Sequence, residues 1–288
     1  MPAPAPALVR YAVIDIGSIA VRLQIATVAE GKLLTEVFTR IPLGLGGGTF
    51  NGRRREISAR NCRRLADTIS GMQLLIASMK PCRYSVVATA AVRDAINGNS
   101  VSDHIRQHCG IRLRILSGRA EATIIGCYAA SHFPAAPAVL NADIGGGSTD
   151  CAIIGGGKLQ IAATFAIGTA RPNGGSDEEK NRYRQWLQQH TPAQAVISSS
   201  GGSATQLQQL CGTLSETRLA RWQKEINGLS VTELSARYDM SPDRAAHAMD
   251  AVDIYRLLLA ASGGKNIQPV RGGLSEALIW EKLTAGKD

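Results

Sequence analysis

The sequence predicts a mixed α/β protein built from two lobes, with a ligand expected in the cleft between them. The main observation is a β-branched run that ends in Asp-x-Gly and occurs twice, at residues 11–18 and 139–146. Each copy is followed by two further strand-like segments and then by helices. An internal duplication explains this repeated order.

The elements of the first half follow from hydrophobic periodicity. After the first run, residues 21–28 and 33–41 are predicted as strands, so that three strands form a meander. Apolar residues at helical spacing then predict helices at residues 57–79, 100–109 and 117–131. The first lobe is therefore expected to place its meander before its helices.

A short segment rich in proline and alanine separates the two halves. Residues 132–137, His-Phe-Pro-Ala-Ala-Pro, break the helical pattern, so we expect an N-terminal lobe at residues 1–132 and a C-terminal lobe at 133–288. Three glycines at 155–157 predict a hairpin turn. Further strands of the second lobe are expected at residues 151–154, 158–165, 195–198 and 267–270. Its helices are expected at residues 177–189, 205–211, 214–226, 242–261 and 274–283.

Composition limits the classes of protein that fit. With 288 residues, of which 44% are hydrophobic and 19% charged, the chain predicts a soluble globular protein large enough for two domains. The charge balance, 32 − 23 = +9, favours an anionic partner. The six cysteines include no C-x-x-C pair, which predicts reduced thiols. Without an apolar leader or a run of about 18 apolar residues, we expect a cytoplasmic protein with no membrane partner.

The second Asp-x-Gly run carries the clearest sign of chemistry. Residues 143–150, DIGGGSTD, place three glycines and two hydroxyls between two carboxylates. Glycines after a strand often form a concavity of backbone N–H groups that binds an anion such as phosphate. If the two turns face each other, Asp15 and Asp143 converge where Mg²⁺ would relieve their repulsion. One such turn alone would be explained as well by ordinary turn chemistry, but the duplication favours a ligand.

Seven motifs in this order resemble the exopolyphosphatase and guanosine pentaphosphate phosphatase (Ppx/GppA) family. They are DIGSIAVR at 15–22, ATAAVRDA at 88–95, ILSGRAEA at 115–122, DIGGGSTD at 143–150, IGTAR at 167–171, SGGSAT at 200–205 and GGLSE at 272–276. The resemblance covers about residues 11–283. It implies two actin-like, ribonuclease H-like α/β lobes with an active site in the cleft between them.

The resemblance also implies an activity and a set of site residues. It implies an Mg²⁺-dependent enzyme that removes the terminal phosphate from inorganic polyphosphate or the 5′ γ-phosphate from guanosine pentaphosphate. Glu121 would activate the attacking water, assisted by Asp150, where the family usually carries a glutamate. Asp15 and Asp143 would hold Mg²⁺. Phosphate would be bound by Ser18, Arg22, Arg93, Gly145, Gly146, Gly147, Ser148 and Thr149.

Several positions depart from the family pattern. Ile19 and Ala20 replace an Asn-Ser pair, Gly47 stands in place of an acidic residue, and Ala120 replaces a glutamate. Each lost polar contact to an ionised phosphate costs about 1.5 to 3 kcal/mol. The departures leave three alternatives open: a slow enzyme, a shifted substrate, or a sensor that binds polyphosphate or the alarmone without hydrolysis. A sugar or acetate kinase is a weaker option within the fold group.

Features outside these motifs leave further questions open. The additional helical domains of longer members are absent, which makes a homodimer one way to complete a polymer channel. Arginines at 53–55, 60, 63 and 64 form either a solvated helix face or a landing surface for a polyanion. No aromatic residue interleaves with them, so nucleic acid is not an expected partner. His104 and His108 have zinc-binding spacing, but without further ligands we expect no zinc site.

Overall fold

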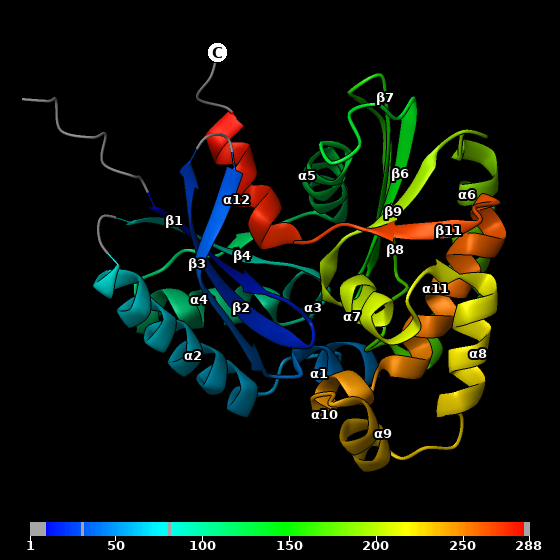
Figure 1. Ribbon diagram of the computed structural model, residues 1–288. Helices are drawn as coiled ribbons and strands as arrows, with labels where there is room; N and C mark the ends of the chain where they lie inside the picture. Colours follow the sequence, from blue (N-terminus) through cyan, green and yellow to red (C-terminus); the bar gives the residue numbers. More distant parts are fainter. Residues whose placement is uncertain (1–9, 30–31, 80–81, 285–288) are drawn as a thin grey trace, which may run out of the picture.

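Two mixed β-sheets with flanking helices form the two lobes of the protein (Figure 1). The structure, a computed structural model, describes residues 10–29, 32–79 and 82–284. The expectation of no apolar leader rests on residues 1–9, which lie outside the described residues. No helix among the described residues is long and apolar enough to span a membrane.

The first sheet opens with the predicted meander. Its five strands are β1 (Arg10–Ile16), β2 (Ala20–Ala29), β3 (Lys32–Pro42), β4 (Cys82–Ala88) and β5 (Arg114–Ile115). They lie in the order β3-β2-β1-β4-β5, with β1 to β3 antiparallel and β4 parallel to both β1 and β5. Hydrophobic periodicity does not predict β4, because its first half is exposed or half-buried and only Val86 to Ala88 are buried.

The second sheet repeats this arrangement. Its strands are β6 (Ala138–Ile144), β7 (Thr149–Gly155), β8 (Lys158–Phe165), β9 (Val196–Ser199), β10 (Leu214–Ser215) and β11 (Asn266–Pro269). In the order β10-β11-β9-β6-β7-β8, strands β6 to β8 form an antiparallel meander and β9 lies parallel to β6. Asp15 lies opposite Arg22 in the first meander, and Asp143 lies opposite Asp150 at the matching position of the second. The predicted duplication is therefore confirmed.

The glycines between β7 and β8 form the predicted hairpin turn. Gly156 and Gly157 have φ angles of 56° and 73°. Two successive residues with positive φ are typical of a type I′ turn, whose twist matches that of the strands it joins. The turn therefore has a structural role away from the cleft.

Five helices follow the first meander. They are α1 (Leu45–Asn51), α2 (Ala59–Ser78), α3 (Ala90–Arg93), α4 (Gly98–Cys109) and α5 (Gly118–Ala130). Ser58 and Ser117 fix the start of α2 and α5, since each side chain accepts a hydrogen bond from a backbone N–H of the first turn. The three helices predicted in this half are confirmed, with ends shifted by up to two residues.

The helices of the second half are α6 (Asp177–His190), α7 (Gly201–Cys211), α8 (Glu216–Ile226), α9 (Val231–Tyr238), α10 (Pro242–Ala245), α11 (Ala248–Ser262) and α12 (Leu274–Thr284). The prediction of one helix over residues 242–261 is wrong. His247, with φ −113° and ψ 6°, lies between α10 and α11 and separates them. Periodicity also misses α9, which is too short for a clear pattern but begins with a capping box formed by Ser230 and Glu233.

Helices α5 and α12 interlock the two lobes. Helix α5 comes from the first half of the chain and packs against β6, β7 and β8, whereas α12 comes from its end and packs against β1 and β2 (Figure 1). The two helices also pack against each other, in a core that includes Val13, Ile125, Ala129 and Leu278. Each lobe therefore contributes a helix to the other, while the boundary at residue 132 stays a prediction.

Candidate active site

A cavity of about 370 Å³ lies between the lobes. Ten of the twelve predicted site residues line it, and they come from β1, β2, α5, β6, β7 and the turns that follow β1 and β6. These ten are Asp15, Ser18, Arg22, Glu121, Asp143, Gly145, Gly146, Gly147, Ser148 and Asp150. Arg93 and Thr149 do not line it. The duplicated fold thus brings both Asp-x-Gly turns to one cleft.

The two turns have the same backbone geometry. Gly17 N donates to Ala20 O at 3.1 Å, and Gly145 N donates to Ser148 O at 2.9 Å. The closing bond of the second turn does not use the amides of Gly146 and Gly147, which lie inside it. The turn therefore offers the concavity of N–H groups that an anion requires.

Space around the second turn admits only glycine. A Cβ on Gly147 would lie 2.5 Å from Phe50 Cζ and 2.6 Å from Ser18 Oγ, both in the first lobe. A Cβ on Gly146 would lie 2.8 Å from Ile19 Cγ1. The glycines are thus required by the close approach of the two lobes.

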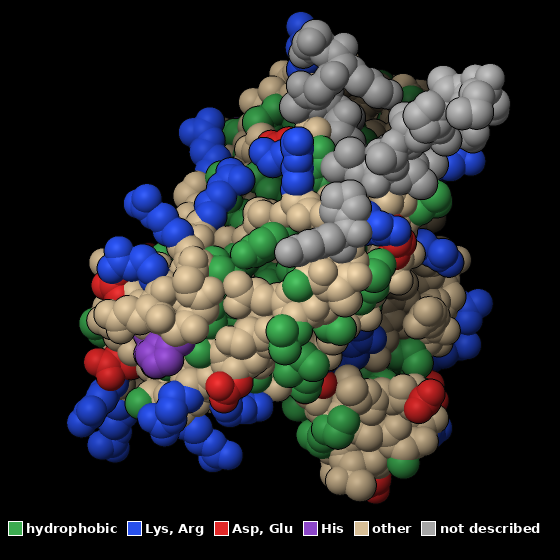
Figure 2. Space-filling model, turned by 90° about the vertical axis from the view of Figure 1, so that its left-hand side faces the viewer, with side chains coloured by type: hydrophobic (Ala, Val, Ile, Leu, Met, Phe, Trp, Pro, Cys, Tyr) green, Lys and Arg blue, Asp and Glu red, His purple; other side chains and the backbone are tan. Residues whose placement is uncertain are grey.

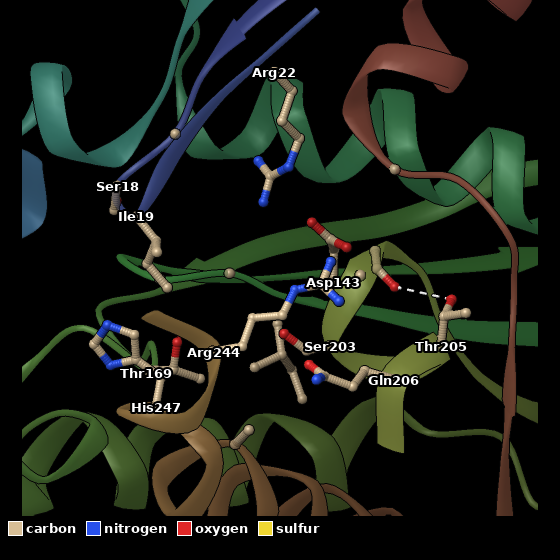
Figure 3. Close-up of a pocket in the computed structure, with 18 of the residues that line it drawn as sticks. Ser18, Ile19, Arg22, Asp143, Thr169, Ser203, Thr205, Gln206, Arg244 and His247 are labelled. Carbon is tan, nitrogen blue, oxygen red and sulfur yellow. Dashed lines mark hydrogen bonds between the residues drawn. The ribbon is translucent and has the colours of Figure 1, made fainter. Parts of the chain in front are cut away.

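Two carboxylates stand at the ends of the equivalent strands. Asp15 accepts a hydrogen bond from Arg22 Nη1 at 3.1 Å, and Asp143 accepts one from Ser200 Oγ at 2.9 Å. Arg22 points from β2 toward Asp143 (Figure 3). Burial raises the pKa of both carboxyl groups, while the positive charge of Arg22 lowers it. A bound cation would favour their charged forms.

A second carboxylate pair, Glu121 and Asp150, faces the same cleft. Burial, and then the charge of Asp150, raises the pKa of Glu121 well above its usual value. Burial raises the pKa of Asp150 to about 6, against a hydrogen bond from Ser148 Oγ to Asp150 Oδ2 at 2.7 Å. The Oδ1 atom of Asp150 is buried, and the hydroxyl of Thr164, which lies opposite Asp150 on β8, lowers the pKa of this carboxyl group. Two buried carboxyl groups with raised pKa values are suited to proton transfer.

Arg93 and Thr149 do not line the cavity but contact residues next to it. Arg93 Nη1 lies 3.4 Å from Glu121 Oε2 and donates to Leu116 O at 3.1 Å, so this side chain orients the glutamate. The hydroxyl of Thr149 is buried and donates to Ile167 O at 3.0 Å. In this arrangement the Thr149 hydroxyl holds the neighbouring loop.

That loop supports the glycine turn and escapes sequence reasoning. Thr169 N donates to Gly145 O at 3.1 Å, and Ala170 N donates to Gly146 O at 2.8 Å. Gly168 packs directly on the turn, where a Cβ would lie 2.5 Å from Gly146 O. The motif IGTAR was visible in the sequence, but nothing in it indicated that its backbone would fasten the turn.

The far side of the cavity belongs to the second lobe. Arg244 and His247, from the α10–α11 junction, point into it together with Ser203 and Gln206 of α7 (Figure 3). Burial lowers the pKa of Arg244, and the nearby charge of Arg40 lowers it further. The sequence does not distinguish Arg244 from its other Lys and Arg residues, 32 in all. Only the fold brings Arg244 into the same cavity as the glycine turn.

The departures from the family pattern have clear structural results. Ile19 lines the cavity and its side chain packs on Gly146, so it offers phosphate no polar atom. Ala20 is buried, and its carbonyl closes the first turn. A Cβ on Gly47 would meet no atom within 4 Å, which leaves room for a larger side chain.

Carboxylates are the groups that could hold a metal ion in this cavity, and Asp243 and Glu276 also line it. Among the described residues, no group of three or more His, Cys, Asp or Glu side chains forms a ready metal site. His108 Nδ1 contacts His104 O at 2.8 Å. Asp15 and Asp143 form a pair of hard oxygen ligands, which suits an ion that keeps several waters and takes further ligands from a phosphate.

Two α/β lobes of actin-like topology, with a glycine turn that faces buried carboxylates in the cleft, define the class of this protein, and the predicted fold class is confirmed. The model of the Ppx/GppA phosphatase family matches residues 25–264. The chain belongs to this family, as its motifs indicated.

Known proteins of the family show both the likeness and its limits. Exopolyphosphatase 1 of Mycobacterium tuberculosis is 27% identical over 191 residues, and its counterpart in Mycobacterium leprae is 26% identical over the same length. The matched region covers 66% of this chain and spans about half the length of these relatives (52% and 53%). The activity of these relatives is therefore only proposed for this chain.

Solved structures confirm the fold over almost the whole chain. A Ppx/GppA family member from Aquifex aeolicus is 21% identical, with a TM-score of 0.78, and covers 98% of this chain and 99% of its own. An exopolyphosphatase from Cytophaga hutchinsonii is 20% identical, with a TM-score of 0.83, and covers 96% and 98%. At such identities the likeness establishes the fold alone.

Proposed function

We propose that the protein is an Mg²⁺-dependent exopolyphosphatase, which hydrolyses the terminal phosphoanhydride bond of inorganic polyphosphate. The observation that carries this proposal is the meeting of two buried carboxylates, Glu121 and Asp150, with the glycine turn at residues 145–148 in one cavity. The surplus of positive charge, +9, supports a substrate of high negative charge.

In the proposed mechanism the glycine turn binds the terminal phosphate. The amides of Gly146 and Gly147 donate to its oxygen atoms, and Arg22 adds positive charge from β2. Donors that are already oriented toward developing negative charge lower the barrier without reorganisation. Catalysis by positioning and charge is what phosphoryl transfer requires.

Glu121 accepts the proton of the attacking water. Its raised pKa makes it a stronger base than an exposed glutamate, and the contact with Arg93 Nη1 holds its carboxylate in place. Asp150 lines the same cavity and assists by accepting the second hydrogen bond of the water. The hydrogen bond from Ser148 to Oδ2 holds the carboxylate of Asp150 in place.

Asp143 and Asp15 would hold the Mg²⁺ ion. The pair fits this ion because Mg²⁺ is usually bound by one or two carboxylates together with water and substrate phosphates. Both groups are largely buried, and a divalent cation would offset the cost of keeping them charged. When bound, the ion would neutralise part of the charge on the polyphosphate.

A second candidate, hydrolysis of guanosine pentaphosphate, is favoured by the shape of the cavity. Beyond the phosphate end, the cavity continues into the second lobe, where apolar and amide side chains lie beside the charged residues Asp243 and Arg244. The apolar and amide residues are Gln206, Gln209, Leu210, Trp222 and Met240. Apolar walls with a few polar groups are typical of sites for small organic ligands. A nucleoside fits such a lining better than a chain of phosphates does.

Phosphate release decides between these functions. We would measure it from short polyphosphate, long polyphosphate and guanosine pentaphosphate while Mg²⁺ is titrated, with Glu121→Gln as the matched control. We expect release from polyphosphate that requires both Mg²⁺ and Glu121. A higher kcat/KM for guanosine pentaphosphate would favour the second candidate. Tight binding without release would identify a sensor, and full activity of Glu121→Gln would remove Glu121 from its proposed role.

A further inference from the structure

Six arginines lie together on the surface between α1 and α2. We call them the arginine patch; they are Arg53, Arg54, Arg55, Arg60, Arg63 and Arg64, and all are exposed. The segment of residues 53–64 contains one acidic residue, so its charge is 6 − 1 = +5, more than half of the +9 of the whole chain. Figure 2 shows the side of the molecule on which α2 lies, where Lys and Arg outnumber Asp and Glu.

The charges of the patch are not compensated within the protein. Among the described residues, none of the six arginines forms an ion pair with a carboxylate. Three of them lie in the first two turns of α2, where the helix dipole is also positive and the first turn has no acidic residue. Arg60 and Arg64 are four residues apart, so like charges face each other on the helix surface. A patch with this much unfavourable charge is explained by an anionic partner.

The patch adjoins the mouth of the cavity. Arg22 and Arg40 are paired residues on β2 and β3, and both line the cavity. Two residues beyond Arg40, at the end of β3, the carbonyl of Pro42 accepts a hydrogen bond from Arg64 Nη2 at 3.5 Å. Arginine side chains therefore follow one another from the cavity to the start of α2, although Arg22 and Arg40 are paired with Asp15 and Asp243.

Helix α1 makes a second connection. Phe50 of α1 reaches the glycine turn, where its ring limits the space at Gly147. Arg53 follows Phe50 by three residues, so the patch begins just beyond the end of α1. The patch and the phosphate end of the cavity are thus parts of one side of the molecule.

We propose that the arginine patch binds the part of an inorganic polyphosphate chain that extends beyond the cavity. This inference rests on the proposed function, since it takes the end of the same chain to lie on the glycine turn. A polymer with one negative charge on each unit can contact several arginines at once and release its counterions, as nucleic acids do. Short polyphosphate ends within the cavity and does not reach the patch. The patch therefore makes the protein selective for long chains.

The test compares long and short substrates. In the triple variant Arg60→Gln/Arg63→Gln/Arg64→Gln, we expect the KM for polyphosphate of several hundred units to rise on the order of tenfold at low salt. The KM for tripolyphosphate and the kcat for both substrates should stay within about twofold. The dependence of the long-chain KM on salt should also become less steep. The control is Arg218→Gln/Arg221→Gln/Lys224→Gln, which removes three exposed charges from α8.

Several results would overturn the inference. These are an unchanged long-chain KM, an equal rise for tripolyphosphate, or the same rise in the α8 control. If the triple variant loses binding of single-stranded RNA but keeps its long-chain KM, the patch is a nucleic-acid surface. If the wild-type protein releases no phosphate, the proposed function fails, and binding of long and short polyphosphate to both triple variants then tests the patch alone.

Discussion

Arg171 of the second lobe donates from Nη2 to Asp94 Oδ2 of the first lobe over 2.7 Å. Asp94 also accepts a hydrogen bond from Arg93 Nε at 3.2 Å, and Arg93 in turn contacts Glu121. From its own Nε, Arg171 donates to the carbonyl of Gly147. A chain of ionic contacts therefore crosses the cleft and connects the glycine turn with the proposed base.

The substitution Asp94→Asn tests this connection. Without the charge of Asp94, Arg93 and Arg171 lose their shared partner, and we expect kcat/KM to fall about tenfold, as for a half-buried hydrogen bond between charged groups. Arg93 lowers the pKa of Glu121, so a displaced Arg93 leaves that pKa higher. The acid limb of the pH profile of kcat/KM should then move to higher pH.

The pH profile separates positioning from a general loss of structure. If Asp94→Asn lowers activity equally at all pH values, Asp94 only holds the lobes together. The matched control is Asp103→Asn, which removes an exposed carboxylate from the pair with Arg106 on α4. That variant should keep the wild-type rate and profile, because exposed pairs contribute little.

The substitution Gly147→Ala should block closure of the cleft. Its Cβ would lie 2.5 Å from Phe50 Cζ and 2.7 Å from Ala90 Cβ, both across the cleft. Because the lobes can separate to relieve the clash, we expect kcat/KM to fall at least about a hundredfold while the melting temperature changes little. Gly47→Ala is the control, since its Cβ meets no atom within 4 Å. Equal activity in both alanine variants would show that close contact at Gly147 is not needed.

The parts of this fold that sequence predicts are those encoded locally. Both meanders carry β-branched runs, and the Asp-x-Gly repeat shows the two positions that meet in the cleft. Strand β4 is not apparent because half of it is exposed, and the break between α10 and α11 at His247 carries no glycine or proline as a marker. Local patterns therefore give the lobes but not every element within them.

The residues of the candidate site also divide into those that the sequence predicts and those that it misses. Asp15 and Asp143 are found from sequence because each lies within a repeated motif. Arg171 and Arg244 are missed as site residues because their positions depend on contacts between elements far apart in the chain. Asp94 lies within a recognisable motif, but its role as the shared partner of two arginines depends on the closed arrangement of the lobes. Charges that meet across a cleft leave no periodic signal.

Stability and activity should respond to pH in opposite directions. The pKa of Asp150 rises on folding from 3.8 to about 6, so the folded state binds more protons than the unfolded state between these values. The contribution of Asp150 to the stability of the folded state is fully present below pH 3.8 and is lost as pH rises toward 6. Over the same range Asp150 takes up the charged form in which it assists the attacking water. At about 1.36 kcal/mol per pH unit, the loss is on the order of 3 kcal/mol.

The variant Asp150→Asn checks this trade between stability and activity. It removes the charge and keeps the shape, so at pH 8 we expect unfolding to require about 1 to 3 kcal/mol more than for the wild type. At pH 4 the two proteins should have similar stability, and the variant should lack most activity at both pH values. Denaturant titrations at the two pH values measure the difference. A variant that is less stable at pH 8 would show that the hydrogen bond from Ser148 outweighs the cost of the buried charge.

The first turn offers a test by gain of function. Ile19 lines the cavity beside Gly146 and presents only carbon to a bound phosphate. Asparagine is smaller than isoleucine and adds an amide donor, and a hydrogen bond to a charged group contributes about 1.5 to 3 kcal/mol. We therefore expect Ile19→Asn to raise kcat/KM for polyphosphate at least about tenfold. Ile19→Leu, which changes shape without adding a donor, should not.

The direction of this change also separates an enzyme from a sensor. If the wild-type protein binds polyphosphate without hydrolysis and Ile19→Asn restores release, the carboxylates Glu121 and Asp150 are competent and the first turn alone limits the reaction. If Ile19→Asn binds more tightly but releases no phosphate, the limit lies with the carboxylates or with closure of the cleft. An unchanged KM and kcat would mean that the side chain at residue 19 does not reach the phosphate, because a new donor in contact with it would alter at least one of the two.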